Sequence, residues 1–463
     1  MTTPNIVFFF ADDQRFDTIH ALGNSAIKTP NIDKLVARGT TFTHAHIPSG
    51  TSGAVCMPSR AMLHSGRSLF HIERVGQSIP QAHTTLGEAL QANGYHTFGT
   101  GKWHNGEESF NRSFSSGAEI MFGGMADHWN VPVYHYDPSG KYNTTIPLCT
   151  DPFKGKQIQQ RSADHINSGI HSSEMVCSAG IEFIQQQDNT QPFFAYIAFL
   201  APHDPRIMPE KFHSMYDPAN IELPPNFAGG HPFDNGGLHI RDEELAAFPR
   251  TPEETREHIA EYYAMISHLD HELGRVVQAL EAKGMLDNTI IVFAGDNGLA
   301  VGQHGLFGKQ NCYEHSVRVP LIFAGPGVPE DNKTDAYAYL FDIYPTLCKL
   351  TQTPVPESVE GQDLTACMQD SEAPLRDTLY FAYTDCQRAV KDRDYKLIEY
   401  AVANRERQTQ LFDLKNDPWE LTNLATNPDY ADTVAKLRKE LVRLRDAWDD
   451  QQHEMGKTFW ERY

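Results

Sequence analysis

C-M-P-S-R-A-M-L-H-S-G-R, from Cys56 to Arg67, is the stretch from which the fold of this chain can be worked out. A loop of small residues precedes it, and Pro58 suits the first turn of a helix, where its missing N–H is no loss. We therefore expect Cys56 at or just before a helix N-terminus, where free backbone N–H groups favour anions. Arg60 follows one turn later on the same face and can hold a charged oxygen beside Cys56. The alternative is an inert, buried structural cysteine.

Four apolar segments outside this stretch predict strands buried on both faces of a parallel sheet: Asn5–Phe10, Tyr95–Gly99, Pro192–Leu200 and Asn288–Ala294. Each leads into ionisable or amide side chains, which singly could be turn caps or solvated loop residues. Because strand carboxyl ends meet at one crevice of a doubly wound sheet, we expect these side chains to converge. They are Asp12, Asp13, Lys102, His104, His203, Asp296 and Asn297.

These side chains, together with Arg60 of the cysteine stretch and Lys309 in the turn after the last inner strand, fall into two chemically distinct sets. The first offers hard oxygen ligands that suit Ca²⁺ or Mg²⁺, from Asp12, Asp13, Asp296 and Asn297. The second offers cations and hydrogen-bond donors for a tetrahedral oxyanion and its leaving group, from Arg60, Lys102, His104, His203 and Lys309. A divalent metal beside a ring of cations is what displacement at sulfur or phosphorus needs.

The same positions carry a resemblance to the sulfatase family that extends over nearly the whole chain. The motifs are C-x-P-S-R at Cys56, G-K-W-H at Gly101, P-H-D-P at Pro202, G-D-N-G at Gly295, G-K at Gly308, and L-F-D-L-x-x-D-P-x-E-x-x-N-L from Leu411 to Leu424. The resemblance implies an alkaline-phosphatase-like fold and a sulfuric ester hydrolase with Ca²⁺ as its metal. It also implies that a maturation enzyme oxidises Cys56 to formylglycine, whose hydrated aldehyde binds the metal and is the nucleophile.

The resemblance also assigns roles to the cationic set. Arg60 and Lys102 would stabilise the nucleophile and the sulfate charge, and His104 would act as the base on the remaining hydroxyl. His203 and Lys309 would contact the sulfate and help to protonate the leaving oxygen, a task that suits a histidine.

Two other functions remain as alternatives. A phosphomonoester or phosphonate hydrolase is one, because both oxyanions fit such a pocket, although a two-zinc phosphatase would need a Ser or Thr nucleophile and a second, histidine-rich metal set. The other is a non-catalytic module that binds sulfated glycans, which would require the nucleophile or a metal ligand to be replaced. We therefore expect a sulfatase.

The substrate is expected to be a sulfated carbohydrate, with a small aryl or choline sulfate as the alternative. Loops 105–161 and 205–251 and the turn Phe70–Arg74 should shape the leaving-group side, and their side chains suit stacking on a sugar and pairing with its anionic groups. Candidate substrate-binding residues, each of which could instead be a solvated loop residue, are His71, Arg74, Arg206, His231, His239 and Arg241.

The chain of 463 residues is long enough for two domains. We expect an α/β catalytic domain over residues 1–361, with a large mixed, mostly parallel sheet sandwiched by helices. Residues 362–463 should form a smaller subdomain of antiparallel strands and one helix, which carries Val434, Leu437, Leu441, Leu444 and Trp448 on one face. The Pro/Glu-containing connector Pro354–Gly361 is the expected boundary.

Composition limits the partners. The 39 Lys and Arg against 60 Asp and Glu give a net charge of −21, which argues against nucleic acid or an anionic membrane as a partner. No apolar run approaches the roughly 18 residues that cross a bilayer. Seven cysteines without a C-x-x-C pair predict neither a disulfide framework nor a zinc site. The N-terminus shows no secretory signal pattern, so the expected location is cytoplasmic, or periplasmic or secreted if a leader has been removed.

Overall fold

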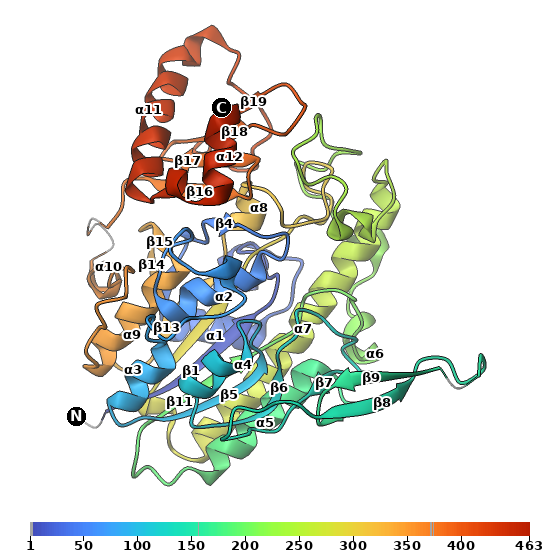
Figure 1. Ribbon diagram of the computed structural model, residues 1–463, viewed down its shortest axis with the longest axis vertical. Helices are drawn as coiled ribbons and strands as arrows, with labels where there is room; N and C mark the ends of the chain where they lie inside the picture. The colour runs from blue at the N-terminus through green and yellow to red at the C-terminus, as the bar shows by residue number, and fades with distance from the viewer. Residues whose placement is uncertain (1–2, 156, 371–372, 374) are drawn as a thin grey trace.

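A computed structural model describes residues 3–155, 157–370, 373 and 375–463. Its centre is an eight-stranded sheet with the order β14-β2-β13-β12-β1-β11-β5-β6 (Figure 1). Five neighbouring strands run parallel: β12 (Thr289–Gly295), β1 (Asn5–Ala11), β11 (Phe193–Ala198), β5 (His96–Lys102) and β6 (Ser116–Met121). The antiparallel strand β13 separates them from β2 and β14; the bounds are Leu321–Ala324, Gly39–Phe42 and Asn332–Thr334. The predicted mixed, mostly parallel sheet is confirmed.

Helices cover both faces of this sheet because the side chains of a strand alternate between its faces. Ile6, Phe8 and Phe10 of β1 belong to one buried apolar cluster, whereas Val7 and Phe9 belong to the other. The first cluster includes residues of α2 (Cys56–Ser65), α3 (Leu86–Ala92) and α9 (Ile343–Thr351). The second includes residues of α1 (Pro30–Arg38), α5 (Ser172–Gln186) and α7 (Pro252–Ala282). Burial of apolar surface on both faces therefore fixes the strand ends relative to one another.

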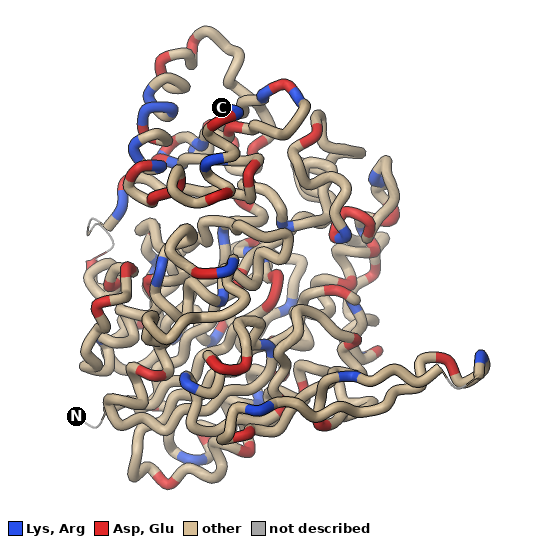
Figure 2. The backbone as a smooth tube through the Cα atoms, viewed as in Figure 1, with Lys and Arg blue, Asp and Glu red and all other residues tan. Residues whose placement is uncertain are grey.

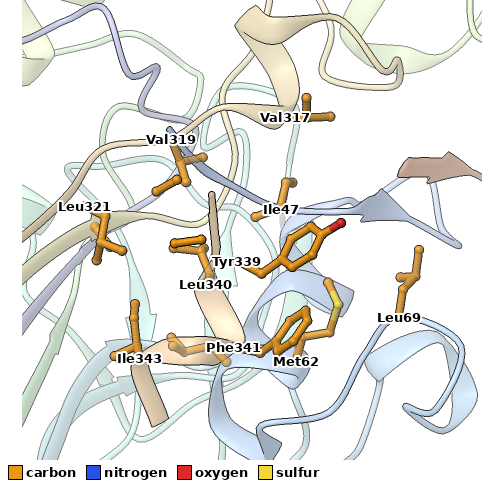
Figure 3. Close-up of a cluster of buried hydrophobic side chains, with 14 of the residues drawn as sticks. Ile47, Met62, Leu69, Val317, Val319, Leu321, Tyr339, Leu340, Phe341 and Ile343 are labelled. Atoms are coloured by element: carbon orange, nitrogen blue, oxygen red, sulfur yellow. The ribbon is translucent and has the colours of Figure 1, made fainter. Parts of the chain in front are cut away.

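The helix that begins with Cys56 rests on the first cluster. Figure 3 shows Met62 of α2 among side chains that come from distant parts of the chain, including Ile47, Val319, Tyr339 and Phe341. Helix α2 ends where Gly66 takes a left-handed conformation, with φ 68°. The predicted helix start at Cys56 is confirmed, and its apolar side is held in the core.

The C-terminal part forms a second sheet with the order β19-β18-β17-β16-β4 (Figure 1). The predicted antiparallel strands are present as β16 (Leu379–Tyr383), β17 (Gln387–Lys391), β18 (Tyr395–Tyr400) and β19 (Gln408–Asp413). Helix α11 (Ala431–Ala447) packs on them through Val434, Leu437, Leu441 and Leu444. Sequence reasoning did not find a second helix, α12 (Glu454–Arg462), which buries Phe459.

Strand β4 (Ser49–Gly50) joins the loop before Cys56 to the C-terminal sheet, because it lies in that loop and pairs with β16. The backbone N–H of Thr384 donates to the Gly50 carbonyl at 2.9 Å. The C-terminal sheet thus supports the loop that leads to Cys56, and the boundary between residues 361 and 362 stays a prediction.

The segment 105–161 is more regular than its composition suggested. It contains α4 (Glu107–Ser113), the edge strand β6 and a hairpin of β8 (Thr145–Cys149) and β9 (Ile158–Ser162), which projects from the body in Figure 1. Strand β6 lacks an apolar run because it lies at the edge of the sheet, where only its last two residues are buried. The other short elements are β3 (Ala45–His46), β7 (Pro132–Val133), β10 (His165–Ile166), β15 (Ala338–Tyr339), α6 (Glu210–His213), α8 (Glu314–Val317) and α10 (Thr365–Gln369).

Charge is spread over both parts of the chain. Figure 2 shows Lys and Arg intermingled with Asp and Glu in the main body and in the C-terminal part. Among the described residues, no helix combines the length and the apolar character that a membrane span requires.

Candidate active site

Cys56 occupies the first position of α2, at the carboxyl end of the parallel strands, and is 2% exposed. Two predicted neighbours contact its sulfur: Lys102 Nζ and His104 Nδ1 each lie 3.5 Å from Sγ. Burial raises the pKa of the Cys56 thiol. An unmodified thiol is therefore held in its neutral, weakly nucleophilic form at this position.

The ten residues predicted for catalysis and metal binding all lie together. Lys102 pairs with Asp12, and Lys309 Nζ donates to Asp13 Oδ1 at 2.6 Å. Arg60 donates from Nε to Asp296 Oδ2 at 2.9 Å and from Nη1 to the Lys102 carbonyl at 2.8 Å. Further contacts join Asn297 Nδ2 to Asp13 Oδ1 at 2.6 Å and place His203 Nε2 3.6 Å from Asp13 Oδ2. Residues up to 296 positions apart thus form one buried constellation.

The acidic side of this constellation fits a hard divalent cation. Asp12, Cys56 and Asp296 each offer one ligand atom, and these three atoms lie within 4.8 Å of one another. Asp12 Oδ1 and Asn297 Oδ1 are buried and accept no hydrogen bond. Because an unpaired buried oxygen is costly, two such atoms beside clustered carboxylates match the ligand set of Ca²⁺ or Mg²⁺. These residues could hold a metal ion.

The protonation states follow from burial and from crowded charge. Burial and the neighbouring Asp12 carboxylate raise the pKa of Asp296 to about 7. Burial alone would raise the pKa of Asp12, but Lys102 and other nearby cations outweigh it and hold that pKa well below its usual range. Burial, reinforced by Lys102, lowers the pKa of His104 to about 2, so its imidazole is neutral. A divalent cation would relieve the repulsion between the carboxylates.

The backbone is strained where two strands deliver these side chains. Asp13 and His104 have φ of 67° and 71°, in the left-handed region that costs a non-glycine residue about 1–3 kcal/mol. Gly298 of the G-D-N-G motif is required for a different reason. A Cβ there would lie 2.1 Å from the His315 carbonyl oxygen, so the turn after Asp296 closes only with glycine.

Two of the six candidate substrate-binding residues, Arg206 and Arg241, lie near the His203–Asp204 turn, and the other four have different surroundings. Arg241 donates from Nη1 to Asp204 Oδ1 at 2.7 Å, next to His203. Arg206 is buried, donates from Nη1 to His258 Nδ1 at 2.7 Å, and leaves its Nε and Nη2 groups without acceptors. The other four are placed as follows: His71 lies against Glu360 and Asp449, His231 against Tyr313 and the Phe233 carbonyl, and Arg74 and His239 are exposed. Their substrate contacts remain predictions.

Sequence reasoning missed residues that hydrogen-bond to the backbone carbonyls of Asp13 and Asp296. The Tyr262 hydroxyl donates to the Asp13 carbonyl at 2.6 Å and accepts the Arg15 N–H at 2.9 Å. Ser59 Oγ donates to the Asp296 carbonyl at 2.5 Å. The only signal for Tyr262 was its place on an amphipathic helix, where it was indistinguishable from a core residue.

An α/β fold of this kind, with buried carboxylates and cations gathered around one cysteine, defines a hydrolase of the alkaline-phosphatase-like superfamily. A family model described as Sulfatase matches residues 4–353, and one described as N-sulphoglucosamine sulphohydrolase, C-terminal, matches residues 302–447. The chain belongs to the sulfatase family, and it is a sulfuric ester hydrolase.

Individual relatives span the whole chain. An arylsulfatase of Clostridium perfringens is 29% identical over 469 residues, covering 95% of this chain and 94% of its own. The multifunctional alkaline phosphatase superfamily protein PehA of Trinickia caryophylli is 28% identical over 513 residues, covering 96% of both chains. A solved structure in complex with its substrate D-glucosamine-2-N,6-O-disulfate superposes with a TM-score of 0.75 at 20% identity, covering 98% of this chain and 99% of that one. That structure establishes the shared fold.

Proposed function

We propose that this enzyme removes sulfate from a sulfated carbohydrate, with formylglycine made from Cys56 as its nucleophile and Ca²⁺ as its metal. The observation that carries the proposal is the position of Cys56, at a helix N-terminus between the Lys102 ammonium and the Asp12–Asp296 carboxylates. Asp12, Asp13, Asp296 and Asn297 would hold the cation, which would polarise the bound oxyanion. The formylglycine would supply a hydrated aldehyde oxygen for attack on sulfur.

The chain's own cations suit a sulfate ester. The carboxylates of Asp12, Asp13 and Asp296 are matched by the charges of Arg60, Lys102 and Lys309, so a bound divalent cation would leave the pocket with net positive charge. Lys102 and Lys309 would stabilise the charge of the sulfate oxygens in the transition state. His203 would deliver a proton to the leaving alcohol, and neutral His104 would accept one from the nucleophile's second hydroxyl.

A carbohydrate is supported by the relatives and by the side chains near the site. The structural neighbour binds a disulfated glucosamine, and buried Arg206 has two N–H groups without acceptors close to the His203–Asp204 turn. A guanidinium with free donors suits a carboxylate or a second sulfate on the sugar. Arg241 could contact the same ligand from its exposed side. A small aryl or choline sulfate is the alternative substrate.

The test compares turnover of 4-nitrophenyl sulfate, 4-nitrophenyl phosphate and a panel of sulfated oligosaccharides by enzyme co-produced with the maturation enzyme. We expect sulfate release from at least one oligosaccharide and much slower phosphate release. Faster turnover of the phosphate would favour the phosphoester or phosphonate hydrolase, and sulfate release from the aryl ester alone would overturn the carbohydrate assignment.

The nucleophile is tested in the same assays. Cys56→Ala should abolish turnover, whereas Cys177→Ala, at a buried cysteine in α5, should retain it. Equal activity of both variants would exclude residue 56 as the nucleophile.

A further inference from the structure

A short 3-10 turn, η4 (Arg241–Leu245), contacts several loops of the active site through three successive side chains. Arg241 pairs with Asp204, the residue after His203. Asp242 Oδ2 accepts a hydrogen bond from Gln310 Nε2 at 2.6 Å. The third residue, Glu243, makes the most direct connection, because its carboxylate reaches the backbone that carries Lys309.

Glu243 is 3% exposed and uses both carboxylate oxygens on that backbone. Oε2 accepts the Phe307 N–H at 2.9 Å, and Oε1 accepts the Gly308 N–H at 2.9 Å. Arg250, also 3% exposed, pairs with Oε2 and donates to the Gly305 carbonyl at 3.2 Å. Hydrogen bonds from backbone N–H groups to an ionised carboxylate are stronger than neutral ones. The two N–H groups just before Lys309 are therefore clamped by one anion.

Gln310 makes similar contacts with the backbone around Lys309. Gln310 Oε1 accepts the Lys309 N–H at 2.8 Å, and its Nε2 donates to the Gly53 carbonyl at 2.8 Å, in the loop before Cys56. A Cβ at Gly308 would lie 2.4 Å from Gln310 Oε1 and 2.9 Å from Glu243 Oε1. Glycine at position 308 of the G-K pair thus permits the close approach of both acceptors.

We propose that Glu243 is a positioning residue, which fixes the backbone of residues 307–309 so that the Lys309 ammonium reaches Asp13 and the sulfate oxygens. The inference rests on the function proposed above for Lys309. A carboxylate is needed because it presents two acceptor oxygens to two N–H groups, whereas an amide presents one oxygen and turns an NH₂ group toward a donor. Displacement of the loop by about 1 Å would misplace the lysine enough to slow catalysis.

The experiment measures kcat/KM for 4-nitrophenyl sulfate with Glu243→Gln in the wild-type enzyme and in Lys309→Ala. We expect a fall of about 10- to 100-fold in the wild-type background. In Lys309→Ala the same substitution should cost less than about threefold, because the group that Glu243 positions is already missing. An equal fall in both backgrounds, or no fall in the wild type, would overturn the inference.

Glu420→Gln is the matched control for simple loss of a buried carboxylate. Glu420 also accepts a backbone N–H, that of Glu314 at 2.8 Å, and pairs with the buried Lys396 at 3.1 Å. It should lower the melting temperature while leaving kcat/KM within about twofold of the wild type. A loss of kcat/KM as large as that of Glu243→Gln would show that destabilisation alone explains both and would overturn the inference.

Glu243→Asp decides the matter if Glu243→Gln does not fold. It retains both oxygens but withdraws them by one methylene group, so kcat/KM should lie between those of the wild type and Lys309→Ala. A kcat/KM equal to that of the wild type would overturn the inference.

Lys309→Ala separates this proposal from the one on which it rests. Wild-type turnover by that variant would contradict the role of Lys309 and thereby both proposals, whereas slow Lys309→Ala with normal Glu243→Gln would overturn the positioning role alone.

Discussion

Replacing His64 by leucine should make the protein less sensitive to acid. His64 lies in α2, is 0% exposed, and has no hydrogen-bond partner on either ring nitrogen. Its ring packs against Trp103 and Tyr196, with centroid distances of 4.4 and 4.7 Å. Burial, reinforced by the charge of Arg60, lowers the pKa of His64 from 6.5 to about 3. The folded protein therefore holds this imidazole neutral.

The sign and size of the effect follow from that pKa. The folded state binds the proton less tightly than the unfolded state. Titration of His64 therefore leaves the free energy of unfolding unchanged above pH 6.5 and lowers it as the pH falls from 6.5 toward 3. At pH 5 the wild type should have lost about 2 kcal/mol through this group, at roughly 1.4 kcal/mol per pH unit below 6.5. Leucine cannot titrate, so the difference in unfolding free energy between wild type and variant should change by that amount.

The assay is urea unfolding of both proteins between pH 7.5 and pH 5, followed by circular dichroism. At pH 7.5 the lost ring contacts and the removed unpaired ring nitrogens should nearly cancel, to within about 1 kcal/mol. His213→Leu is the control, at a histidine whose side chain is 57% exposed, and should follow the wild-type curve. Parallel curves for His64→Leu and wild type would refute the reasoning.

Three further perturbations test the site and its support. Glu314→Gln removes the shared counter-ion of buried Lys391 and Lys396, which lie 2.7 and 3.0 Å from the Glu314 carboxylate. It should lower the free energy of unfolding by about 3–5 kcal/mol in chemical denaturation, and a decrease below about 1 kcal/mol would contradict this. Lys102→Met removes the cation paired with Asp12 and should lower kcat for an aryl sulfate about 10²- to 10³-fold. A kcat within about twofold of the wild type would exclude its role. Removal of the metal with a chelator should abolish turnover, and Ca²⁺ at about 100 times its Kd should restore it. The added Ca²⁺ should also raise the free energy of unfolding by about 2.7 kcal/mol, and a melting curve unchanged by Ca²⁺ would argue against a bound cation.

The main sheet and the centre of the site could be predicted because both follow from local patterns. Buried parallel strands such as Asn5–Ala11 are continuous apolar runs, and the charge that follows each one marks its carboxyl end. Once four such strands lie side by side, their terminal residues must converge, whatever their separation in the chain. This is why Asp13 and Asp296, 283 positions apart, could both be assigned to one site.

The parts that could not be predicted depend on contacts that leave no local pattern. Strand β6 lies at a sheet edge and carries no apolar run, and β4 is a pair of residues whose partner is more than 300 positions away. Glu243 stands in the acidic sequence Asp242-Glu243-Glu244, which is typical of a solvated turn, although it is buried against backbone N–H groups. Such residues act through loops that only the folded chain brings together.

The mass of the peptide that contains residue 56, taken from enzyme of known specific activity, tests the central claim most directly. Conversion of the Cys56 thiol to the formylglycine aldehyde removes about 18 Da. Specific activity should rise in proportion to the converted fraction and should be negligible in protein made without the maturation enzyme. Full sulfate ester turnover by protein that retains the cysteine mass at residue 56 would contradict the account.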